Sequence, residues 1–402
     1  MSENILFLTN LLPFPGNSGG TIATKRSLDT FYNNNYNITL LFFSNNTKNE
    51  DIESFKSAYP KLNIWFINNE NNKRSIKNLI VSLFKFIPLN IYRNFNTTFL
   101  SKTNSLLSEK VFDLIYCDHL EMFQYIPKSY HKKTILYEHN AEFMIWKRYA
   151  ERLKNPIIKI PVFLESLRYK NYELKTCDKT GITLAAPNDL LILSEKSRNK
   201  DKFQETYHLG NDTMLYLPTL QKPQNDIHIL FIGTMTWQAN IDAIQWFENQ
   251  VLPILTKKYP NIILDVVGKL KNDDLIKENK NPNIVYHGFV DSTEPFFLNS
   301  TVFVCPLQFG SGMKVKNIEA LYRGIPLVTT TIGAESIDLE NSVNAYITDD
   351  NKQFAIYITD LIEDSELWNK ISTNARILAN KKYTKKQAEE KMLSQINEII
   401  KK

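Results

Sequence analysis

One stretch decides the fold: Pro306-Leu-Gln-Phe-Gly-Ser-Gly-Met-Lys-Val-Lys-Asn-Ile-Glu-Ala-Leu-Tyr-Arg-Gly-Ile-Pro-Leu-Val328. Its pattern predicts a strand end, a glycine loop, a helix over Met313–Arg323 and a second strand. The backbone N–H groups of the loop and the positive end of the helix would face one point, which suits a phosphate group. Lys314 and Lys316 add charge there, and Glu319 follows one turn later. The stretch therefore predicts a site for a phosphate-bearing ligand with a hydroxylated part.

The bulk composition indicates a two-domain globular protein. A chain of 402 residues is too long for a single core. The formal net charge of +5 is mild, so it favours anionic ligands without indicating nucleic acid. Three cysteines without metal-like spacing fit a reducing compartment. No apolar run approaches the roughly 20 residues of a membrane span, and no signal peptide precedes the first strand. We therefore expect a cytoplasmic protein, with peripheral contact at the inner face of the membrane left open.

Short apolar runs alternate with longer helical patterns, which is typical of parallel α/β sheets. Strands are predicted in the first half at Ile5–Asn10, Ile38–Phe43, Leu62–Asn68, Asp113–Asp118, Thr134–His139, Thr180–Leu184 and, as a short strand or a strand and turn, Asp189–Leu193. A long helical region is predicted from Glu142 to about Asp178. Strands are predicted in the second half at Ile227–Ile232, Ile262–Val267, Ile284–Tyr286, Thr301–Cys305, Pro326–Thr329 and Ala345–Ile347.

These elements predict two Rossmann-like domains. The first covers residues 1–217, a polar linker with two prolines covers 218–226, and the second domain covers 227–384. The amphipathic helix 385–402 is expected to pack back on the first domain. Ligands of open α/β sheets lie beyond the carboxyl ends of the strands, so we expect the site in a cleft between the two domains.

The order of motifs resembles glycosyltransferase family 4, also called group 1, whose members are retaining enzymes with the GT-B fold. In the second half the motifs are Phe231-Ile-Gly-Thr-Met-Thr-Trp-Gln-Ala-Asn240, Tyr286-His-Gly-Phe-Val290, the Gly310–Glu319 segment and Gly333-Ala-Glu335. In the first half they are Pro13-Phe-Pro-Gly-Asn-Ser-Gly-Gly20 and Tyr137-Glu-His-Asn-Ala-Glu142. The resemblance covers nearly the whole chain. It implies an acceptor-binding first domain and a nucleotide-sugar-binding second domain.

The resemblance also implies roles for single residues. His139 would face the transferred sugar, Glu319 would hydrogen-bond the donor ribose, and Lys314 and Lys316 would lie near the diphosphate, so these four form the implied catalytic set. The other residues implied in donor binding are Gly19, Gly20, Gly233, Thr234, Asn240, Gly288, Phe289, Val290, Gly310, Ser311, Gly312 and Met313.

Purely structural roles for some of these residues remain as alternatives. His139 could be a buried histidine with satisfied hydrogen bonds, and Thr234 and Asn240 could be a strand end and a helix cap. His119 is expected to be structural or on the surface.

Two departures from the family pattern stand out. Ser311 occupies the position of a common glutamate, and Thr234 and Ala239 occupy the positions of a common Arg and Lys. The diphosphate would therefore depend on Lys314, Lys316 and backbone amides.

The implied activity is retaining transfer of a sugar from a UDP- or GDP-sugar to a glycan or lipid-linked glycan acceptor in surface polysaccharide assembly. We expect no cofactor and no metal, because fixed cations could stabilise the leaving diphosphate and no Asp-x-Asp motif ends a strand. A nucleotide-sugar 2-epimerase of the same fold and a non-catalytic nucleotide-binding subunit of a transferase complex remain as alternatives.

Residues 73–102 contain no Asp or Glu and interleave basic with apolar side chains. Such a basic amphipathic segment indicates contact with an anionic membrane surface. The alternative is a crossover helix that buries its apolar face on the sheet and leaves its lysines in solvent.

Overall fold

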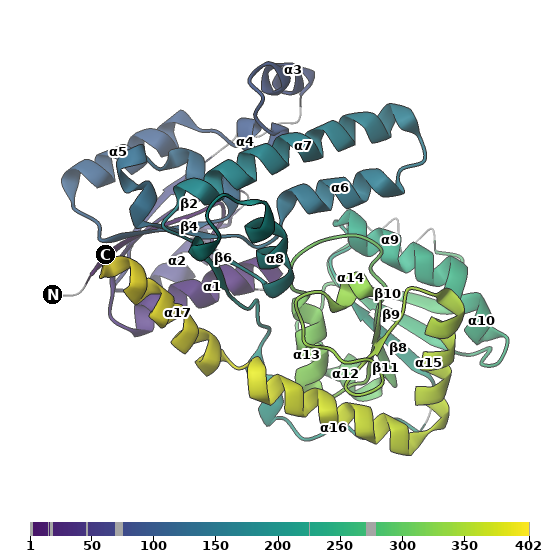
Figure 1. Cartoon of the computed structure of the whole chain (residues 1–402). Helices are drawn as coiled ribbons and strands as arrows, with labels where there is room; N and C mark the ends of the chain where they lie inside the picture. The colour runs from purple at the N-terminus through teal and green to yellow at the C-terminus, as the bar shows by residue number, and fades with distance from the viewer. Residues whose placement is uncertain are drawn as a thin grey trace. The chain divides into compact units, whose positions relative to one another are not determined.

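The computed structural model describes residues 3–14, 16, 19–45, 47–68, 75–224, 226–270 and 279–401. The chain divides into two compact units (Figure 1). The first comprises residues 1–208, 311–313 and 388–402, and the second comprises residues 209–310 and 314–387. The predicted linker 218–226 thus falls within the second unit, because the chain changes units after His208.

The first unit is built on a parallel sheet of seven strands in the order β3-β2-β1-β4-β5-β6-β7. The strands are β1 (Asn4–Thr9), β2 (Asn37–Phe43), β3 (Asn63–Ile67), β4 (Leu114–Asp118), β5 (Thr134–Tyr137), β6 (Ile182–Ala185) and β7 (Phe203–Glu205). Alternate residues of β1 enter two separate cores, Ile5 and Phe7 on one face and Leu6 and Leu8 on the other. A sheet buried on both faces requires the continuous apolar runs seen in the sequence.

Helices cover both faces of this sheet (Figure 1). One face is covered by α1 (Gly19–Asn33), α2 (Asn49–Ala58) and α17 (Lys385–Ile400). The other is covered by α4 (Leu89–Arg93), α5 (Thr97–Glu109), the 3-10 helix η1 (Leu120–Tyr125), α6 (Glu142–Arg152), α7 (Pro156–Lys179) and α8 (Pro187–Lys196). The helix α3 (Ile76–Phe84) precedes α4, and the 3-10 helices η2 (Lys128–Lys133) and η3 (Lys200–Lys202) complete the unit.

The second unit holds a parallel sheet of six strands in the order β10-β9-β8-β11-β12-β13. The strands are β8 (His228–Ile232), β9 (Ile263–Val267), β10 (Ile284–Gly288), β11 (Val302–Cys305), β12 (Leu327–Thr329) and β13 (Tyr346–Ile347). Its helices are η4 (Asp212–Tyr216), α9 (Gln238–Trp246), the π-helical turn η5 (Phe247–Val251), α10 (Leu252–Thr256), α12 (Glu294–Asn299), α13 (Val315–Arg323), α14 (Thr331–Ala334), α15 (Asn351–Glu363) and α16 (Ser365–Lys382).

One sequence prediction of secondary structure was wrong. The run Asp189–Leu193 lies in the helix α8, which starts with Pro187 and carries Asp189 in its first turn. Proline at the first helical position and an acid in the first turn favour a helix, and these signals outweigh the short apolar run. The long helical region after Glu142 is two helices, because Asn155 caps a new helix that begins at Pro156.

The described part of residues 73–102 forms α3, α4 and the start of α5, and Lys73 and Arg74 lie outside the described residues. The alternative of a crossover helix buried on the sheet fails for α3, since Leu79, Ile80 and Leu83 are all exposed. Among the described residues, no helix has the length and apolar character needed to cross a membrane.

The last helix completes the core of the first unit. Met392, Ile396 and Ile399 of α17 pack with residues of α1, α2 and the sheet, and Ile396 is fully buried. We predict that Ile396→Ala lowers the free energy of unfolding by about 2–5 kcal/mol, because it removes buried methyl groups and leaves a cavity. Urea unfolding followed by circular dichroism measures the change. The matched substitution Ile377→Ala, at a side chain that is 58% exposed, should shift the midpoint far less. Equal shifts for the two variants would contradict the packing described.

Candidate functional site

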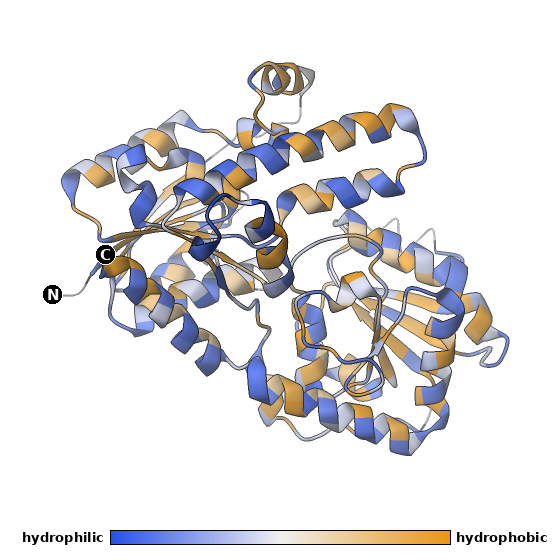
Figure 2. Cartoon of the chain, in the orientation of Figure 1, coloured by the Kyte–Doolittle hydropathy of each residue, from blue (hydrophilic) through white to orange (hydrophobic). Residues whose placement is uncertain are grey.

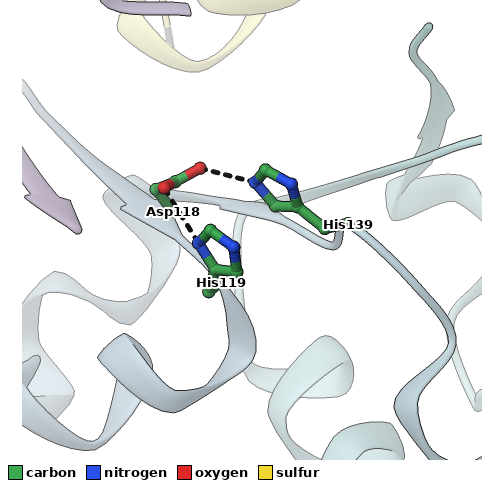
Figure 3. A group of neighbouring side chains, drawn as sticks. All are labelled: Asp118, His119 and His139. Atoms are coloured by element: carbon green, nitrogen blue, oxygen red, sulfur yellow. Dashed lines mark hydrogen bonds and ion pairs between the residues drawn. The ribbon is translucent and has the colours of Figure 1, made fainter. Parts of the chain in front are cut away.

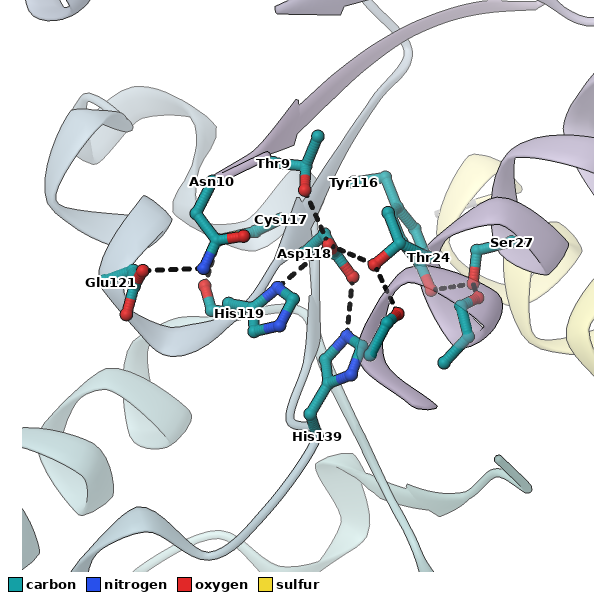
Figure 4. Close-up of polar contacts among 12 residues, drawn as sticks. Thr9, Asn10, Thr24, Ser27, Tyr116, Cys117, Asp118, His119, Glu121 and His139 are labelled. Atoms are coloured by element: carbon teal, nitrogen blue, oxygen red, sulfur yellow. Dashed lines mark hydrogen bonds and ion pairs between the residues drawn. The ribbon is translucent and has the colours of Figure 1, made fainter. Parts of the chain in front are cut away.

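Asp118 lies at the centre of a polar cluster in the first unit (Figure 3). It is the last residue of β4 and is fully buried. One carboxylate oxygen lies 2.9 Å from Nδ1 of His119, and the other lies 2.8 Å from Nε2 of His139. The hydroxyl groups of Thr9 and Thr24 each donate to the carboxylate at 2.8 Å (Figure 4). These contacts satisfy both carboxylate oxygens, so the buried charge is compensated.

The two imidazole rings differ in charge. Burial alone lowers the pKa of His119, but the Asp118 carboxylate outweighs it and raises the pKa to about 9. Burial and the charge of His119 lower the pKa of His139. Although burial opposes it, the charge of His119 and the hydrogen bonds to His119 and His139 hold the pKa of Asp118 well below its usual range. At neutral pH the cluster therefore presents one cationic and one neutral imidazole.

The rings of His119 and His139 are stacked, with centroids 3.8 Å apart, and the ring centroid of His208 lies 5.1 Å from that of His139. The backbone of His119 has a φ of +73°, which is uncommon for a residue with a side chain and occurs often at functional sites. Sequence reasoning found His139 but missed Asp118 and His208, and it expected His119 to be structural or on the surface. An Asp-His pair directly after a buried strand was the available signal.

Asp118, His119 and His139 could also hold a metal ion, because one ligand atom of each lies within 4.8 Å of the others. The ring nitrogens that face Asp118 are at hydrogen-bond distances, 2.8 and 2.9 Å. A metal bound by His119 would have to displace the proton that this ring retains up to its pKa of about 9. A hydrogen-bonded network accounts for the same geometry without one.

A carboxyl group with a shifted pKa lies on the same segment as His139. Glu142 starts α6, and burial together with the charge of Glu121 raises its pKa to about 7. Such a group can both accept and donate a proton near neutral pH. Sequence reasoning quoted Glu142 within a motif but gave it no role.

Gly19 and Gly20 form the amino-terminal end of α1. A Cβ atom added at Gly20 would meet no other atom within 4 Å.

In the second unit, Asn240, which the sequence predicted to bind the nucleotide-sugar, connects the helices α9 and α13. Asn240, in α9, donates from Nδ2 to the carbonyl of Thr234 at 2.9 Å and accepts from Nζ of Lys316 at 2.9 Å. A Cβ atom on Gly233 would lie 2.8 Å from the Asn240 amide, so a larger residue there would displace it. Asn240 thus lies inside α9 and positions Lys316 from α13, in place of the helix-cap role considered above.

The two lysines of α13 lie in different environments. Nζ of Lys316 is 4.0 Å from the centroid of the Phe231 ring, and burial and the charge of Lys314 lower its pKa to about 8. Lys314 is buried, with Nζ 3.6 Å from a carboxylate oxygen of Glu335. A lysine held close to another cation in a partly dry position is stabilised by a bound anion.

Glu319 follows Lys316 by three residues, so the two side chains share one face of α13. Its carboxylate accepts from the backbone N–H of Asn211 at 3.4 Å. A Cβ atom on Gly210 would lie 2.3 Å from the Glu319 side chain, so only glycine allows the backbone to approach so closely. Glu319 is thereby fixed next to the segment that begins the second unit.

The remaining predicted donor residues follow strands of the second sheet. Gly288 ends β10 with a φ of +71°, and the exposed Phe289 and Val290 come next. Gly310 follows β11 with a φ of +141°. The strands are parallel, so these loops and Gly233 lie at the same edge of the sheet. Ser311, Gly312 and Met313 group instead with the first unit, and all three are buried.

Part of the second unit matches a known family model. Residues 226–364, which include Asn240, both lysines and Glu319, match the family model for glycosyl transferases group 1. An uncharacterized 44.6 kDa protein in the cps region of Klebsiella pneumoniae is 22% identical, over 95% of this chain and 97% of its own length. The capsular polysaccharide biosynthesis glycosyltransferase CapM of Staphylococcus aureus is 28% identical, over 54% of this chain and 58% of its own length.

The fold matches solved structures as well. Anabaena HepE in complex with UDP superposes with a TM-score of 0.67 at 13% identity, covering 99% of this chain and 100% of that one. HepE has also been solved with UDP-glucose. The two sheets and their order of strands thus form the GT-B fold.

The histidine cluster generates a prediction about pH. We expect Asp118→Asn to lower the pKa of His119 from about 9 toward its ordinary value, because the raising charge is removed. NMR titration of the imidazole protons measures the shift. The folded pKa of His119 is above the unfolded one, so its stabilising effect is complete below about pH 6.5 and disappears as the pH rises through about 9. A His119 pKa unchanged in Asp118→Asn would contradict this assignment.

Proposed function

As a member of the glycosyl transferases group 1, this chain is a glycosyltransferase with the GT-B fold, and we propose that it transfers a sugar from a UDP-sugar, with retention of configuration. The observation that carries the proposal is the position of Lys314 and Lys316 at the start of α13, beside the carboxyl ends of the strands, with Glu319 one turn further along the helix. The complex of HepE with UDP favours UDP over GDP.

The second unit would bind the nucleotide and its diphosphate. Negative charge builds on the diphosphate as the sugar leaves, and fixed cations and N–H groups stabilise it, typically by about 3 kcal/mol for each good contact. Lys316 supplies one such charge, directed by Asn240, and Lys314 supplies another. Glu319 would accept hydrogen bonds from the ribose hydroxyl groups. We propose that this arrangement works without a metal ion.

The first unit would serve the transferred sugar. Positive charge develops on the sugar ring as the bond to phosphate breaks. The neutral imidazole of His139 can contact the sugar without opposing that charge, because the cationic His119 is paired with Asp118. We propose His139 as a sugar-contacting residue and Asp118 as the residue that orients it.

The acceptor is proposed to be a glycan or lipid-linked glycan of a surface polysaccharide. The gene region named for the Klebsiella pneumoniae relative and the capsular role named for CapM support this choice. A 2-epimerase would need no acceptor, so product formation that depends on an added glycan separates the two activities.

The donor site generates a prediction on nucleotide binding. We expect Lys316→Ala and Glu319→Ala each to weaken UDP binding by about ten- to a hundredfold, since hydrogen bonds to charged groups contribute about 1.5–3 kcal/mol. Affinity for UDP in the unmodified protein should fall as the pH rises through about 8, because Lys316 then loses its proton. Isothermal titration calorimetry measures both effects.

The matched control is Lys352→Ala, because Lys352 lies exposed on α15 of the same unit. It should bind UDP like the unmodified chain. Treatment with EDTA should leave sugar transfer unchanged. If Lys316→Ala and Lys352→Ala bind UDP equally well, the donor site is wrongly placed.

Membrane contact through the segment 73–102 is a further part of the proposal. The helix α3 is largely apolar (Figure 2), and its residues Leu79, Ile80, Leu83 and Phe84 are exposed. The exposed fractions of Phe84 and of Phe86, which follows the helix, are 87% and 73%. Lys85 lies between these two residues in the sequence, and Lys77 lies two turns earlier, in α3. Apolar side chains next to lysines suit the interface of an anionic bilayer.

This contact predicts binding to vesicles. The unmodified protein should sediment with phosphatidylglycerol vesicles more than with phosphatidylcholine vesicles. The double variant Lys77→Glu and Lys85→Glu should lose the preference, because it reverses two charges, and Phe84→Ser should weaken both interactions. Lys352→Glu, in the other unit, serves as the control. Unchanged sedimentation of the double variant would count against this surface.

A further inference from the structure

A small pocket of about 160 Å³ adjoins the histidine cluster in the first unit. It is lined by Asn10 and Leu11 after β1, Phe43 and Asn45 at the end of β2, Asn94 after α4, and Glu121, Met122, Gln124 and Tyr125 of η1. We call it the amide pocket. It lies at the carboxyl edge of the sheet, where ligands of parallel α/β sheets bind.

The amide pocket contains buried acceptors with no partner among the described residues. Nδ2 of Asn10 donates to Glu121 at 2.7 Å, but Oδ1 of Asn10 is buried and accepts no hydrogen bond from the described part of the chain. The same holds for Oδ1 of Asn94. Leaving a buried acceptor unsatisfied is costly, so each of these atoms requires a donor, which water or a ligand can supply.

The framework of the pocket is fixed by other contacts. The Tyr125 hydroxyl donates to the backbone carbonyl of Asn94 at 2.5 Å, and Nε2 of Gln124 donates to the carbonyl of Glu121 at 2.9 Å. These bonds hold the backbone while the Asn94 side-chain oxygen remains available. The pocket is thus preorganised, which reduces the entropy lost on binding.

The chemistry of the lining selects the ligand. Amide groups both donate and accept, as the hydroxyl groups of a sugar require. Among the described residues that line the pocket there is a carboxylate, Glu121, and no Lys, Arg or His. A phosphate or a sugar carboxylate would find no cation and would be repelled by Glu121.

We propose that the amide pocket binds an uncharged sugar residue of the acceptor. This inference rests on the proposed transferase function, since it assigns the donor to the second unit and leaves this polar, non-basic pocket for the other substrate. Asn10 follows Thr9, which donates to Asp118, and Glu121 follows His119 by two residues (Figure 4). An acceptor hydroxyl held here would lie on the same strand ends as His139.

The test is ligand-observed NMR with the methyl glycosides of glucose, galactose and N-acetylglucosamine, and with methyl glucuronide. At least one neutral glycoside should bind, and methyl glucuronide should bind at least about tenfold more weakly. Asn10→Ala and Asn94→Ala should each weaken the neutral glycoside by about five- to tenfold, because each removes an otherwise unsatisfied acceptor. Glu121→Gln should narrow the gap between neutral and charged glycosides, which a merely structural role for Glu121 would not do.

The matched control is Asn104→Ala, an exposed asparagine on α5. Its glycoside binding should equal that of the unmodified protein, and circular dichroism checks that every variant is folded. The inference is overturned if no neutral glycoside binds, if methyl glucuronide binds equally well, or if Asn10→Ala behaves like Asn104→Ala. UDP binding, measured on the same samples, reports on the proposed function separately, because Asn10 and Asn94 lie outside the donor unit.

Discussion

A buried carboxylate at the end of β4 is the constraint on which the first unit's chemistry depends. Asp118 has no exposed surface, so its charge persists only if neighbouring groups donate to it. Two threonine hydroxyls and two imidazoles meet this demand. In doing so, the carboxylate fixes the orientation of both rings. It also keeps His119 cationic, while His139 is neutral. The orientation and charge state of His139 are therefore set by the fold around Asp118 and not by the histidine alone.

In the second unit the unfavourable feature is the closeness of two positive charges. Lys314 and Lys316 lie two residues apart at the start of α13, where the helix dipole disfavours positive charge. Glu335 lies close to one lysine, and Asn240 accepts from the other. A group of cations at a helix start is unfavourable without an anion, so its presence there is an argument for a phosphate ligand.

The sequence predicted the layers of the fold well, because continuous apolar runs and glycine stops are local signals. Gly324, expected to end a helix, has a left-handed φ of +75° and does so. The exception, Asp189–Leu193, failed because a short apolar run has no periodicity that separates strand from buried helix.

Residues of the candidate site could be proposed from the sequence where they are close together in the chain, as at Lys314–Glu319. Contacts between residues that are far apart in the chain could not be predicted. Asp118 lies 21 residues from His139 in sequence, and Asn10 lies 111 residues from Glu121. Asn240 and Lys316, which form a hydrogen bond, are also far apart in the sequence, by 76 residues.

The return of residues 388–402 to the first unit also determines when that unit can finish folding. The last strand of its sheet ends at Glu205, yet Met392, Ile396 and Ile399 are made only after the whole second unit. At a synthesis rate of roughly 5–20 residues per second, the sheet waits about ten seconds or more for its covering helix. The first unit begins the chain, but it can complete its core only after the second unit has been synthesised.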